Sequence, residues 1–365
     1  MIQHLYVHIP FCPKVCPYCS FYKEASDRHK TQRFLDALLR ELDLKQKTLP
    51  LQPQTIFFGG GTPSALSTAQ LDFLLTGLRD RLDLSRLQEW TLEMNPATVS
   101  LEKATRLRAL GVNRISMGVQ AWDAPTLQAL GRVHSAAQAL RSYEILREAG
   151  FDNLNLDLIF GTPGQTSEAW FDTLERTIAL APEHLSAYCL TYEEDTEFFR
   201  RFQAGEMQQD DSFDADLYEG SIARLEAAGY SQYETSNYSL PDRECEHNFA
   251  YWTGRDYLGL GPSAFSTVGA DRWKNIPDTS AYCHLIETAG DARSFHEAVT
   301  PEILLSERIA FGLRTNRGVA LTHLTNRLEK VAGLTADGFL QQGNGHIFLT
   351  RRGRLVADTV AEWLM

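Results

Sequence analysis

Short β-rich runs recur along the first half of the chain, and each is followed by a segment with helical periodicity. The runs span residues 4–9, 55–59, 90–95, 113–119, 153–159 and 184–191. Strands that alternate with helices form parallel sheets, so this rhythm predicts an α/β fold. The number of units predicts an incomplete TIM-like barrel of the (β/α)6 type. In such a barrel the functional residues lie at the C-terminal ends of the strands and in the loops that follow.

The segments between these runs carry helix signals. Apolar residues recur at helical spacing over residues 34–42, and Ser67 with Gln70, like Ser135 with Gln138, has the spacing of a capping box. Glycines follow three further helical patterns, where a left-handed residue commonly ends a helix: Gly111, Gly150 and Gly229.

The length and the composition allow one large barrel with a small appended domain. The chain has 365 residues, and 43% of them are hydrophobic, which is enough to fill a core. The net charge of -12 repels polyanions, so we expect no nucleic-acid partner. The sequence contains neither a signal peptide nor an apolar stretch of membrane-spanning length, which predicts a cytoplasmic protein.

Three cysteines lie close together directly after the first β-rich run: Cys12, Cys16 and Cys19. Thiolates are typical ligands of zinc and of iron-sulfur clusters. A structural zinc site is closed by four ligands, whereas a 4Fe-4S cluster held by three cysteines leaves one iron open for chemistry. The spacing therefore favours a cluster with an open iron.

Two other interpretations of the cysteines stay open. A disulfide cannot use all three thiols, and the remaining cysteines are far apart in the sequence, unlike those of a secreted disulfide framework. A zinc site could take His4 or His8 as its fourth ligand, but the loop is rich in proline and lacks paired Cys-x-x-Cys knuckles. Both interpretations fit the spacing less well than a cluster does.

Strand alternation separates polar from apolar side chains. Tyr6 and His8 share one face of the first strand, Glu93 stands alone among apolar neighbours in the third, and Asn155 and Asp157 share one face of the fifth. We expect this polar set to face the barrel lumen, where a ligand, water or a closed hydrogen-bond network must satisfy it.

A glycine triplet follows the second strand, in the sequence Gly-Gly-Gly-Thr-Pro at residues 59–63. Glycines place bare backbone against a ligand, although they also make ordinary tight turns. No lysine follows, which disfavours a phosphate-binding P-loop.

The cysteine loop resembles the signature of radical S-adenosylmethionine (SAM) proteins, because Tyr18 stands just before the last cysteine of a Cys-x-x-x-Cys-x-x-Cys pattern. The resemblance implies a 4Fe-4S cluster on Cys12, Cys16 and Cys19, with SAM chelating the fourth iron. It implies reductive cleavage of SAM to a 5'-deoxyadenosyl radical, while the protein supplies orientation and excludes water. It also implies a radical SAM barrel, in agreement with the strand rhythm.

Several strand ends resemble the oxygen-independent coproporphyrinogen III oxidase-like family, and the likeness runs from Tyr6 to Trp252. The matching stretches are Thr-Leu-Glu-Met-Asn-Pro at 91–96, Met-Gly-Val-Gln at 117–120, Leu-Gly-Arg at 130–132 and Leu-Asp-Leu-Ile-Phe-Gly-Thr-Pro at 156–163. The resemblance implies a SAM site made of Tyr6, Tyr18, Gly60, Gly61, Thr62, Glu93, Gln120, Arg132 and Asp157. In this site a planar guanidinium suits the SAM carboxylate, and the acidic and amide groups suit the ribose and the amine.

Two positions separate the two functions found within this family. The true dehydrogenase has a further cysteine at the position of Phe21 and oxidatively decarboxylates two propionates of coproporphyrinogen III to vinyls. The HemW-type heme-chaperone branch lacks that cysteine and carries a His-Asn-x-x-Tyr-Trp motif, found here at residues 247–252. The resemblance therefore implies a chaperone that binds heme and transfers it, and the dehydrogenase is the alternative.

An exposed-loop His247 beside aromatic rings is a candidate axial ligand of heme. The competing interpretation is a histidine that caps a turn above a core cluster. Cys245 is a candidate for covalent heme attachment or a buried structural thiol.

The chaperone hypothesis implies three partners: heme, a heme-acceptor protein and an electron donor for the cluster. It leaves open whether SAM is turned over, whether the protein is an enzyme, and whether it forms a homodimer.

The βα rhythm stops near residue 300. Helical patterns at 304–313, 321–331 and 337–342 precede a Gly-Asn-Gly turn at 343–345, which predicts a hairpin, and a basic helix follows Thr350. Helices with a hairpin wing predict an α+β winged-helix-like domain, and its few arginines make a weak phosphate track.

The predicted organisation has three parts. We expect residues 1–235 to form the barrel, residues 236–300 to form a connecting segment with the His-Asn-x-x-Tyr-Trp motif, and residues 301–365 to form the C-terminal domain. The last part is predicted to be a structural or partner-docking module.

Overall fold

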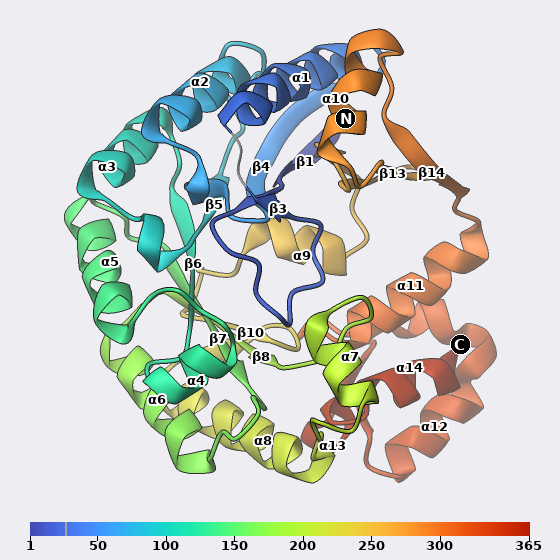
Figure 1. Ribbon diagram of the computed structural model, residues 1–365. Coiled ribbons are helices and arrows are strands. Elements are labelled where there is room, and N and C mark those ends of the chain that lie inside the picture. The colour runs from blue at the N-terminus through green and yellow to red at the C-terminus, as the bar shows by residue number, and fades with distance from the viewer. Residues whose placement is uncertain (26–27) are drawn as a thin grey trace.

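A curved sheet surrounded by helices forms the centre of the computed structural model, which describes residues 1–25 and 28–365 (Figure 1). Its parallel strands pair in chain order: β1 (Ile2–Ile9), β4 (Leu51–Gly60), β5 (Glu89–Met94), β6 (Arg114–Gln120), β7 (Leu154–Phe160) and β8 (His184–Cys189). The outer ring consists of α1 (Arg28–Gln46), α2 (Thr68–Arg79), α3 (Leu101–Leu110), α5 (Ala136–Glu148), α6 (Ser167–Ala179) and α8 (Asp211–Ala227). Shorter helical segments fill the connections: η1 (Pro63–Ala65), η2 (Pro96–Thr98), α4 (Ala124–Ala129) and α7 (Glu197–Gln203). The predicted α/β barrel is confirmed.

The two faces of each strand have opposite character, as the sequence alternation predicts. On β1, Leu5 and Val7 are buried in the core beneath the outer helices, whereas Tyr6 faces a cavity in the lumen. Apolar residues of α1, including Leu38 and Leu42, are fully buried against this face. Burial of these side chains stabilises the barrel wall and leaves the lumen to polar and aromatic groups.

The ends of the helices follow their sequence signals. Ser67 and Ser135 each cap a helix in a complete capping box, with Gln70 and Gln138 as the reciprocal partners. Gly111 ends α3 at a φ of 107°, a backbone conformation that glycine adopts without steric cost. No helix within the described ranges has both the length and the apolar character needed to cross a bilayer.

The sheet continues beyond the parallel strands at both edges. Next to β1 come β11 (Tyr257–Leu260), β12 (Phe265–Val268), β13 (Asp271–Asn275) and β14 (Arg293–Ala298). Next to β8 come β10 (Asn237–Ser239) and β9 (Ser231–Gln232). The two outermost strands, β14 and β9, do not pair with each other, so the sheet stays open, as expected for an incomplete barrel. Residues 236–300 therefore extend the sheet and also contribute α10 (Thr279–Thr288), which packs on α1.

A short helix lies inside the ring rather than around it. Helix α9 (Glu246–Trp252) crosses the space enclosed by the strands and packs on β4 (Figure 1). Its N-terminus is fixed by Glu89, the first residue of β5, whose carboxylate accepts hydrogen bonds from the backbone amides of Glu246 and His247 at 3.0 and 3.2 Å. Helix α9 thus closes the lumen at the end where the strands begin.

The C-terminal part has its own hydrophobic core and follows the barrel at the lower right of Figure 1. Its elements are α11 (Pro301–Leu313), β15 (Val319–Ala320), η3 (Leu321–Arg327), α12 (Leu328–Ala336), β16 (Leu340–Gly343), β17 (His346–Leu349), α13 (Arg351–Arg354) and α14 (Ala357–Leu364). The predicted hairpin is confirmed as β16 and β17. The expected helix at 337–342 is wrong, because Gly338 leaves α12 at a φ of 78° and the following residues pair as a strand.

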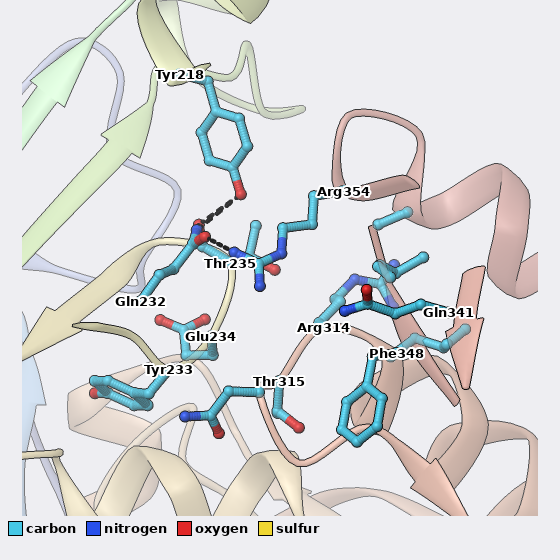
Figure 2. A pocket seen from close by; sticks show the side chains of 14 residues that line it. Tyr218, Gln232, Tyr233, Glu234, Thr235, Arg314, Thr315, Gln341, Phe348 and Arg354 are labelled. Carbon is cyan, nitrogen blue, oxygen red and sulfur yellow. Dashed lines mark hydrogen bonds between the residues drawn. The ribbon is translucent and has the colours of Figure 1, made fainter. Parts of the chain in front are cut away.

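A cavity of about 120 Å³ separates the β9–β10 hairpin from the C-terminal part (Figure 2). Arg354 reaches across it to Gln232, and Glu234 forms a β-bridge with Thr315. The Glu234 side chain is 3% exposed, and its Oε1 has no hydrogen-bond partner in the described part of the chain. Burial raises the pKa of Glu234 to about 7.

Candidate functional site

The cysteine-rich loop follows β1 and lies across the mouth of the barrel, in the foreground of Figure 1. Cys12 ends β2 (Phe11–Cys12), which pairs with β3 (Glu24–Ala25). Its thiol lies 3.4 Å from the hydroxyl of Thr62, and Nη1 of Arg132 lies 3.6 Å from the sulfur of Cys16. The loop therefore brings the cysteines to the residues that follow β4 and β6.

The donor set fits an iron-sulfur cluster better than a single metal ion. Among the described residues, no three His, Cys, Asp or Glu side chains converge tightly enough to hold one ion. A cluster needs no such convergence, because each thiolate binds a different iron. Burial raises the pKa of the thiols of Cys12 and Cys19, and coordination would offset this effect because metal-bound thiols are deprotonated. All cysteines of the chain are free thiols, which leaves no support for a disulfide.

A pocket of about 470 Å³ lies beside the loop, and we call it the cluster-side pocket. It brings together most of the residues predicted from the sequence: Tyr18, Cys19, Gly60, Gly61, Thr62, Glu93, Gln120, Arg132 and Asp157. Cys12 and Cys16 lie behind this lining, in contact with Thr62 and Arg132. Tyr6 does not line this pocket and instead faces a second cavity.

The glycine loop after β4 is needed because other parts of the chain approach it closely. A Cβ on Gly60 would lie 2.4 Å from Cε1 of His8, and Gly60 has a φ of 103°. A Cβ on Gly61 would lie 2.7 Å from the carbonyl carbon of Pro10. The amide of Gly61 donates to the carbonyl of Ile9 at 2.8 Å, so the loop is bonded to the end of β1. Side chains at these positions would clash with the end of β1 and displace the loop.

Strain and close packing also mark the end of β6. Gln120 has a φ of 70°, which a non-glycine residue rarely adopts, and the pairing register with β7 shifts between Gly118 and Gln120. Nη2 of Arg132 donates to the carbonyl of Gly118 at 2.8 Å. Nε of Arg132 is buried without a hydrogen-bond partner among the described residues, so this guanidinium still has a donor to offer.

Two carboxyl groups lie next to each other at the lumen end of the pocket. Burial, and then the neighbouring charge of Asp157, raises the pKa of Glu93 to about 8. Asp157 accepts hydrogen bonds from the hydroxyl of Ser116 at 2.9 Å and from the amide of Asn155 at 2.8 Å. Glu93 thus carries a proton at neutral pH, and Asp157 is held by neutral donors.

A second cavity, of about 770 Å³, opens from the same lumen, and we call it the lateral chamber. It shares Phe21, Gly60, Glu93 and Asp157 with the cluster-side pocket. The rest of its wall comes from the lumen faces of β1, β4, β6, β7 and β8, from α9, from β11 to β13 and from α11. The two cavities are therefore neighbours with a common wall.

The polar floor of the lumen is largely a closed network. Nδ2 of Asn155 donates to the hydroxyls of Ser116 and Ser186 at 2.7 and 3.0 Å, and Oδ1 of Asn155 lies 2.6 Å from Nδ1 of His184. Nε2 of His184 lies 2.8 Å from the hydroxyl of Tyr233. These side chains satisfy one another, so the floor needs no ligand.

His247 is not an exposed-loop residue, and that expectation is wrong. Its side chain is fully buried within α9, with Nδ1 2.7 Å from the hydroxyl of Thr55 and Nε2 2.9 Å from the hydroxyl of Tyr251. The ring stacks on Phe57 with centroids 5.3 Å apart. Burial lowers the pKa of His247 to about 3, so the imidazole is neutral. Both ring nitrogens are engaged, and the residue does not fit an axial heme ligand in this conformation.

Cys245 is a buried structural thiol. It has no exposed surface, and its sulfur lies 3.4 Å from Oε1 of Glu89. A thiol enclosed in this way cannot reach a heme vinyl group without opening α9, so it does not fit covalent attachment.

Sequence reasoning missed the wall of the lateral chamber. Tyr251 belongs to the His-Asn-x-x-Tyr-Trp motif but was not singled out, and Tyr257, Lys274 and Arg255 lie just beyond it in the chain. The alternation of Asp271–Asn275, in which Trp273 is buried and its neighbours are not, is a signal that places Lys274 on an open face.

Comparison with known families matches two parts of the chain. Residues 6–177 match the model of the radical SAM superfamily, and residues 299–356 match the HemN C-terminal domain. The solved structure of coproporphyrinogen III oxidase (HemN) from Escherichia coli, a radical SAM enzyme, is similar with a TM-score of 0.86. It is 26% identical, and the match covers 100% of this chain and 90% of that one. Membership of the radical SAM superfamily implies a 4Fe-4S cluster and SAM.

The similar curated proteins include several heme chaperones. HemW from Bacillus subtilis is 34% identical, with 98% of both chains covered. HemW from Escherichia coli is 40% identical over 72% of this chain and 70% of its own length. A mitochondrial radical S-adenosyl methionine domain-containing protein 1 from Danio rerio is 32% identical over 96% of this chain and 82% of its own. The chain therefore belongs to the HemW family of the radical SAM superfamily.

Proposed function

We propose that this chain is a heme chaperone, which binds heme and transfers it to acceptor proteins while carrying a 4Fe-4S cluster and SAM. The observation that carries the proposal is the 34% identity to the Bacillus subtilis heme chaperone HemW over 98% of both chains. Phe21 supports it, because this residue stands where the dehydrogenase motif has a further cysteine.

The cluster-side pocket supplies the groups for both cofactors. Cys12, Cys16 and Cys19 would hold three irons of the cluster, which when bound supplies single electrons to SAM. Nε of Arg132, which has no hydrogen-bond partner among the described residues, suits the SAM carboxylate. A guanidinium group pairs with a carboxylate in a planar fork. Asp157 can accept a hydrogen bond from a ribose hydroxyl or an amine.

The remaining predicted SAM residues act through the backbone or at the rim. Gly60, Gly61 and Thr62 offer backbone groups in a cradle without side chains, and protonated Glu93 can both donate and accept. The ring of Tyr18 packs between the loop and Phe198, with centroids 6.3 Å apart, and helps to exclude water.

A second function keeps one specific observation in its favour. The fold is similar to that of the Escherichia coli coproporphyrinogen III oxidase with a TM-score of 0.86. Oxidative decarboxylation would require the cluster and SAM in the same pocket. Phe21 is 65% exposed and lines both cavities, at the place where a further sulfur would be needed. We therefore rank this activity second.

Further partners are proposed on chemical grounds. Reduction of the cluster requires a separate electron donor, and an oxygen-sensitive cluster favours a reducing compartment such as the cytoplasm. We propose Val15 of the cysteine loop and Val133, which are both exposed, as contacts for the donor or for a homodimer. We keep the division into a barrel at 1–235, a connecting segment at 236–300 and a C-terminal domain at 301–365, and all but the first two residues of the HemN C-terminal match at 299–356 fall in the third part.

The test is an anaerobic reconstitution of the cluster in the full chain, followed by two separate assays. The first titrates heme and then adds a heme-free acceptor protein. The second supplies SAM, a reductant and coproporphyrinogen III, and measures protoporphyrinogen formation. Heme binding with transfer and no porphyrinogen turnover is the expected outcome, and turnover at enzymatic rates would replace the chaperone by the dehydrogenase.

A further inference from the structure

The lateral chamber has walls suited to a flat ring. Aromatic side chains from several distant segments face it: Tyr6, Phe57, Tyr251, Tyr257, Phe265 and Phe311. Tyr6 and Phe57 lie nearly parallel, with centroids 6.3 Å apart and an interplanar angle of 25°, whereas Tyr251 and Tyr257 meet edge to face at 4.6 Å. Aromatic faces of this kind stack on planar ligands. The cavity of about 770 Å³ is large enough for a drug-sized or larger molecule.

One wall of the chamber is built by strand alternation at the edge of the sheet. On β11 and β13, Tyr257, Arg272 and Lys274 line the chamber, while Leu258 and Trp273 are buried on the opposite face. The pairing of β12 with β13 places Phe265 opposite Lys274. The ammonium group of Lys274 lies 4.9 Å from the centre of the Phe265 ring. The same wall therefore presents aromatic rings and cations side by side.

The cations of the chamber differ in how their charge is balanced. Arg272 is paired with Glu307 at 2.7 Å and with Glu297 at 3.3 Å, so its charge is neutralised within the protein. Lys274 and Arg255 have no ion pair with an acidic residue in the described part of the chain, although the protein as a whole carries a net charge of -12. A fourth cation of the lining, Arg114, is fully buried near Glu89 and Asp157, so the exposed Arg255 and the half-buried Lys274 are the cations that suit a ligand with carboxylates.

We propose that the lateral chamber is the heme site, with the porphyrin ring against Tyr6, Phe57 and Tyr251 and the two propionates paired with Arg255 and Lys274. The inference rests on the proposed chaperone function and deepens it, because it names the place of the ligand. The ring is apolar and flat, whereas the propionates are anionic, which matches a chamber that offers both aromatic rings and cations without ion pairs. The cluster-side pocket remains for SAM.

The His-Asn-x-x-Tyr-Trp motif then acts through two different faces of α9. Asn248 and Tyr251 line the chamber, while His247 lies behind the wall. His247 holds the hydroxyl of Tyr251 through Nε2 and stacks on Phe57, so it touches two residues of the proposed ring site from outside. His247 is therefore a positioning residue for the heme site and not an iron ligand.

The test uses the full chain with its cluster reconstituted and follows heme binding by absorbance. The double variant Arg255→Glu, Lys274→Glu should lower heme affinity at least tenfold, because it turns two attractions into repulsions. The matched control is Lys47→Glu, Arg86→Glu, which makes the same change of net charge at exposed positions outside both cavities. SAM affinity should stay within about twofold in both proteins, on the general expectation that distant sites act independently.

The outcomes separate the site from the function. Wild-type protein that binds no heme would remove the proposed function together with this site. Wild-type binding with equal affinity in the Arg255 and Lys274 double variant would overturn the site alone. Heme dimethyl ester provides a second measurement, since the double variant should lose the preference for the free propionates that the wild type has.

The role of His247 is tested by comparing His247→Phe with Tyr251→Phe. The second variant removes only one hydroxyl and is expected to fold. Both should weaken heme binding by a similar few-fold factor, with the absorption spectrum of the bound heme unchanged. A change of the axial-ligand signature in His247→Phe that is absent from Tyr251→Phe would make His247 a ligand and overturn the positioning role.

Discussion

The two cavities of the lumen share a wall but are built in different ways. The cluster-side pocket is formed by the ends of β4 to β8 and by the loops that follow β1 and these strands, and its special features are in the backbone, such as the left-handed Gly60 and Gln120. The lateral chamber is formed by side chains from β1, α9, β13 and α11, which are distant in the sequence. The first cavity combines glycine backbone with carboxyl groups, whereas the second is lined by many aromatic rings and by cations from several segments.

This difference teaches that two ligands can be bound in one barrel with separate determinants. Seven residues line both cavities, and we expect any coupling between the two sites to pass through them: Ser20, Phe21, Gly60, Glu93, Ser116, Asp157 and Tyr188. Variants outside this set should affect one ligand and spare the other.

The largest effect is expected for Cys16→Ser. Removal of one of three thiolates should abolish the cluster, so that iron content falls to background and SAM binding is lost, because SAM chelates the open iron. Heme affinity should remain within about twofold, because Cys16 does not line the lateral chamber. Iron analysis and parallel titrations of SAM and heme measure all three quantities.

Cys283→Ala is the control for this experiment. Cys283 is buried in α10, outside both cavities, and its loss should leave the iron content unchanged. Full iron content in Cys16→Ser would contradict the cluster assignment, and loss of heme binding would contradict the separation of the two sites.

The next effect concerns Glu234, which lies against the C-terminal part of the chain. This part supplies α11 to the lateral chamber. The pKa of Glu234 is about 7 in the folded protein against an ordinary value of 4.5, so the folded state binds more protons between these pH values. The stabilising contribution of the protonated group is therefore present at low pH and is lost as the pH rises through 7. The difference amounts to about 3 kcal/mol.

Glu234→Gln should remove this pH dependence. Denaturant unfolding at several pH values between 5 and 8 should give a free energy that falls with pH in the wild type relative to the variant. Glu329→Gln, at an exposed position of α12, is the control and should keep the wild-type slope. Equal slopes in Glu234→Gln and the wild type would show that the cavity of Figure 2 does not contain the titrating group.

A smaller effect is expected for Gly60→Ala in the cluster-side pocket. The added Cβ would lie 2.4 Å from the His8 ring at a left-handed backbone position, which should destabilise the protein by about 2 kcal/mol. SAM affinity should fall about tenfold, since the clash with His8 would displace the backbone that lines the cluster-side pocket. Gly150→Ala, at a φ of 87° with no heavy atom within 4 Å of the added Cβ, is the control for backbone strain alone. Equal losses in both variants would rule out the close approach as the cause.

The sequence predicted the cluster-side pocket because its determinants are local. A strand end, a glycine triplet and a short cysteine spacing are each readable within a few residues, and parallel strands bring their C-terminal ends to one side of the barrel. The alternation of Tyr6 and His8 on β1 and of Asp157 on β7 also gave the correct lumen face. Of the predicted SAM residues, only Tyr6 lines the lateral chamber without lining the cluster-side pocket.

The lateral chamber could not be predicted in the same way. Its wall requires β11 to pair with β1 and β13 to pair with β12 at the same edge of the sheet. The pairing of β11 with β1 joins residues that are far apart in the sequence, and it has no local signal. His247 was expected on an exposed loop, but Glu89 fixes the N-terminus of α9 inside the barrel and buries the imidazole. The burial of His247 depends on Glu89, which is 158 residues away in the sequence. The motif alone therefore does not reveal which of its side chains faces the ligand.

The smallest effect is expected for Glu307→Gln, which loosens one wall of the lateral chamber. Glu307 on α11 forms two hydrogen bonds of 2.7 Å with Arg272 on β13, and both side chains are mostly buried. The amide keeps the shape but loses the charge, so heme should dissociate a few-fold faster and stability should fall by about 1 kcal/mol. SAM affinity should not change, and Glu302→Gln, fully exposed at the start of α11, should behave as wild type. Unchanged heme dissociation in Glu307→Gln would mean that α11 encloses the chamber without holding its ligand. Heme retention in the lateral chamber would then have to come from the strands of the sheet and from α9.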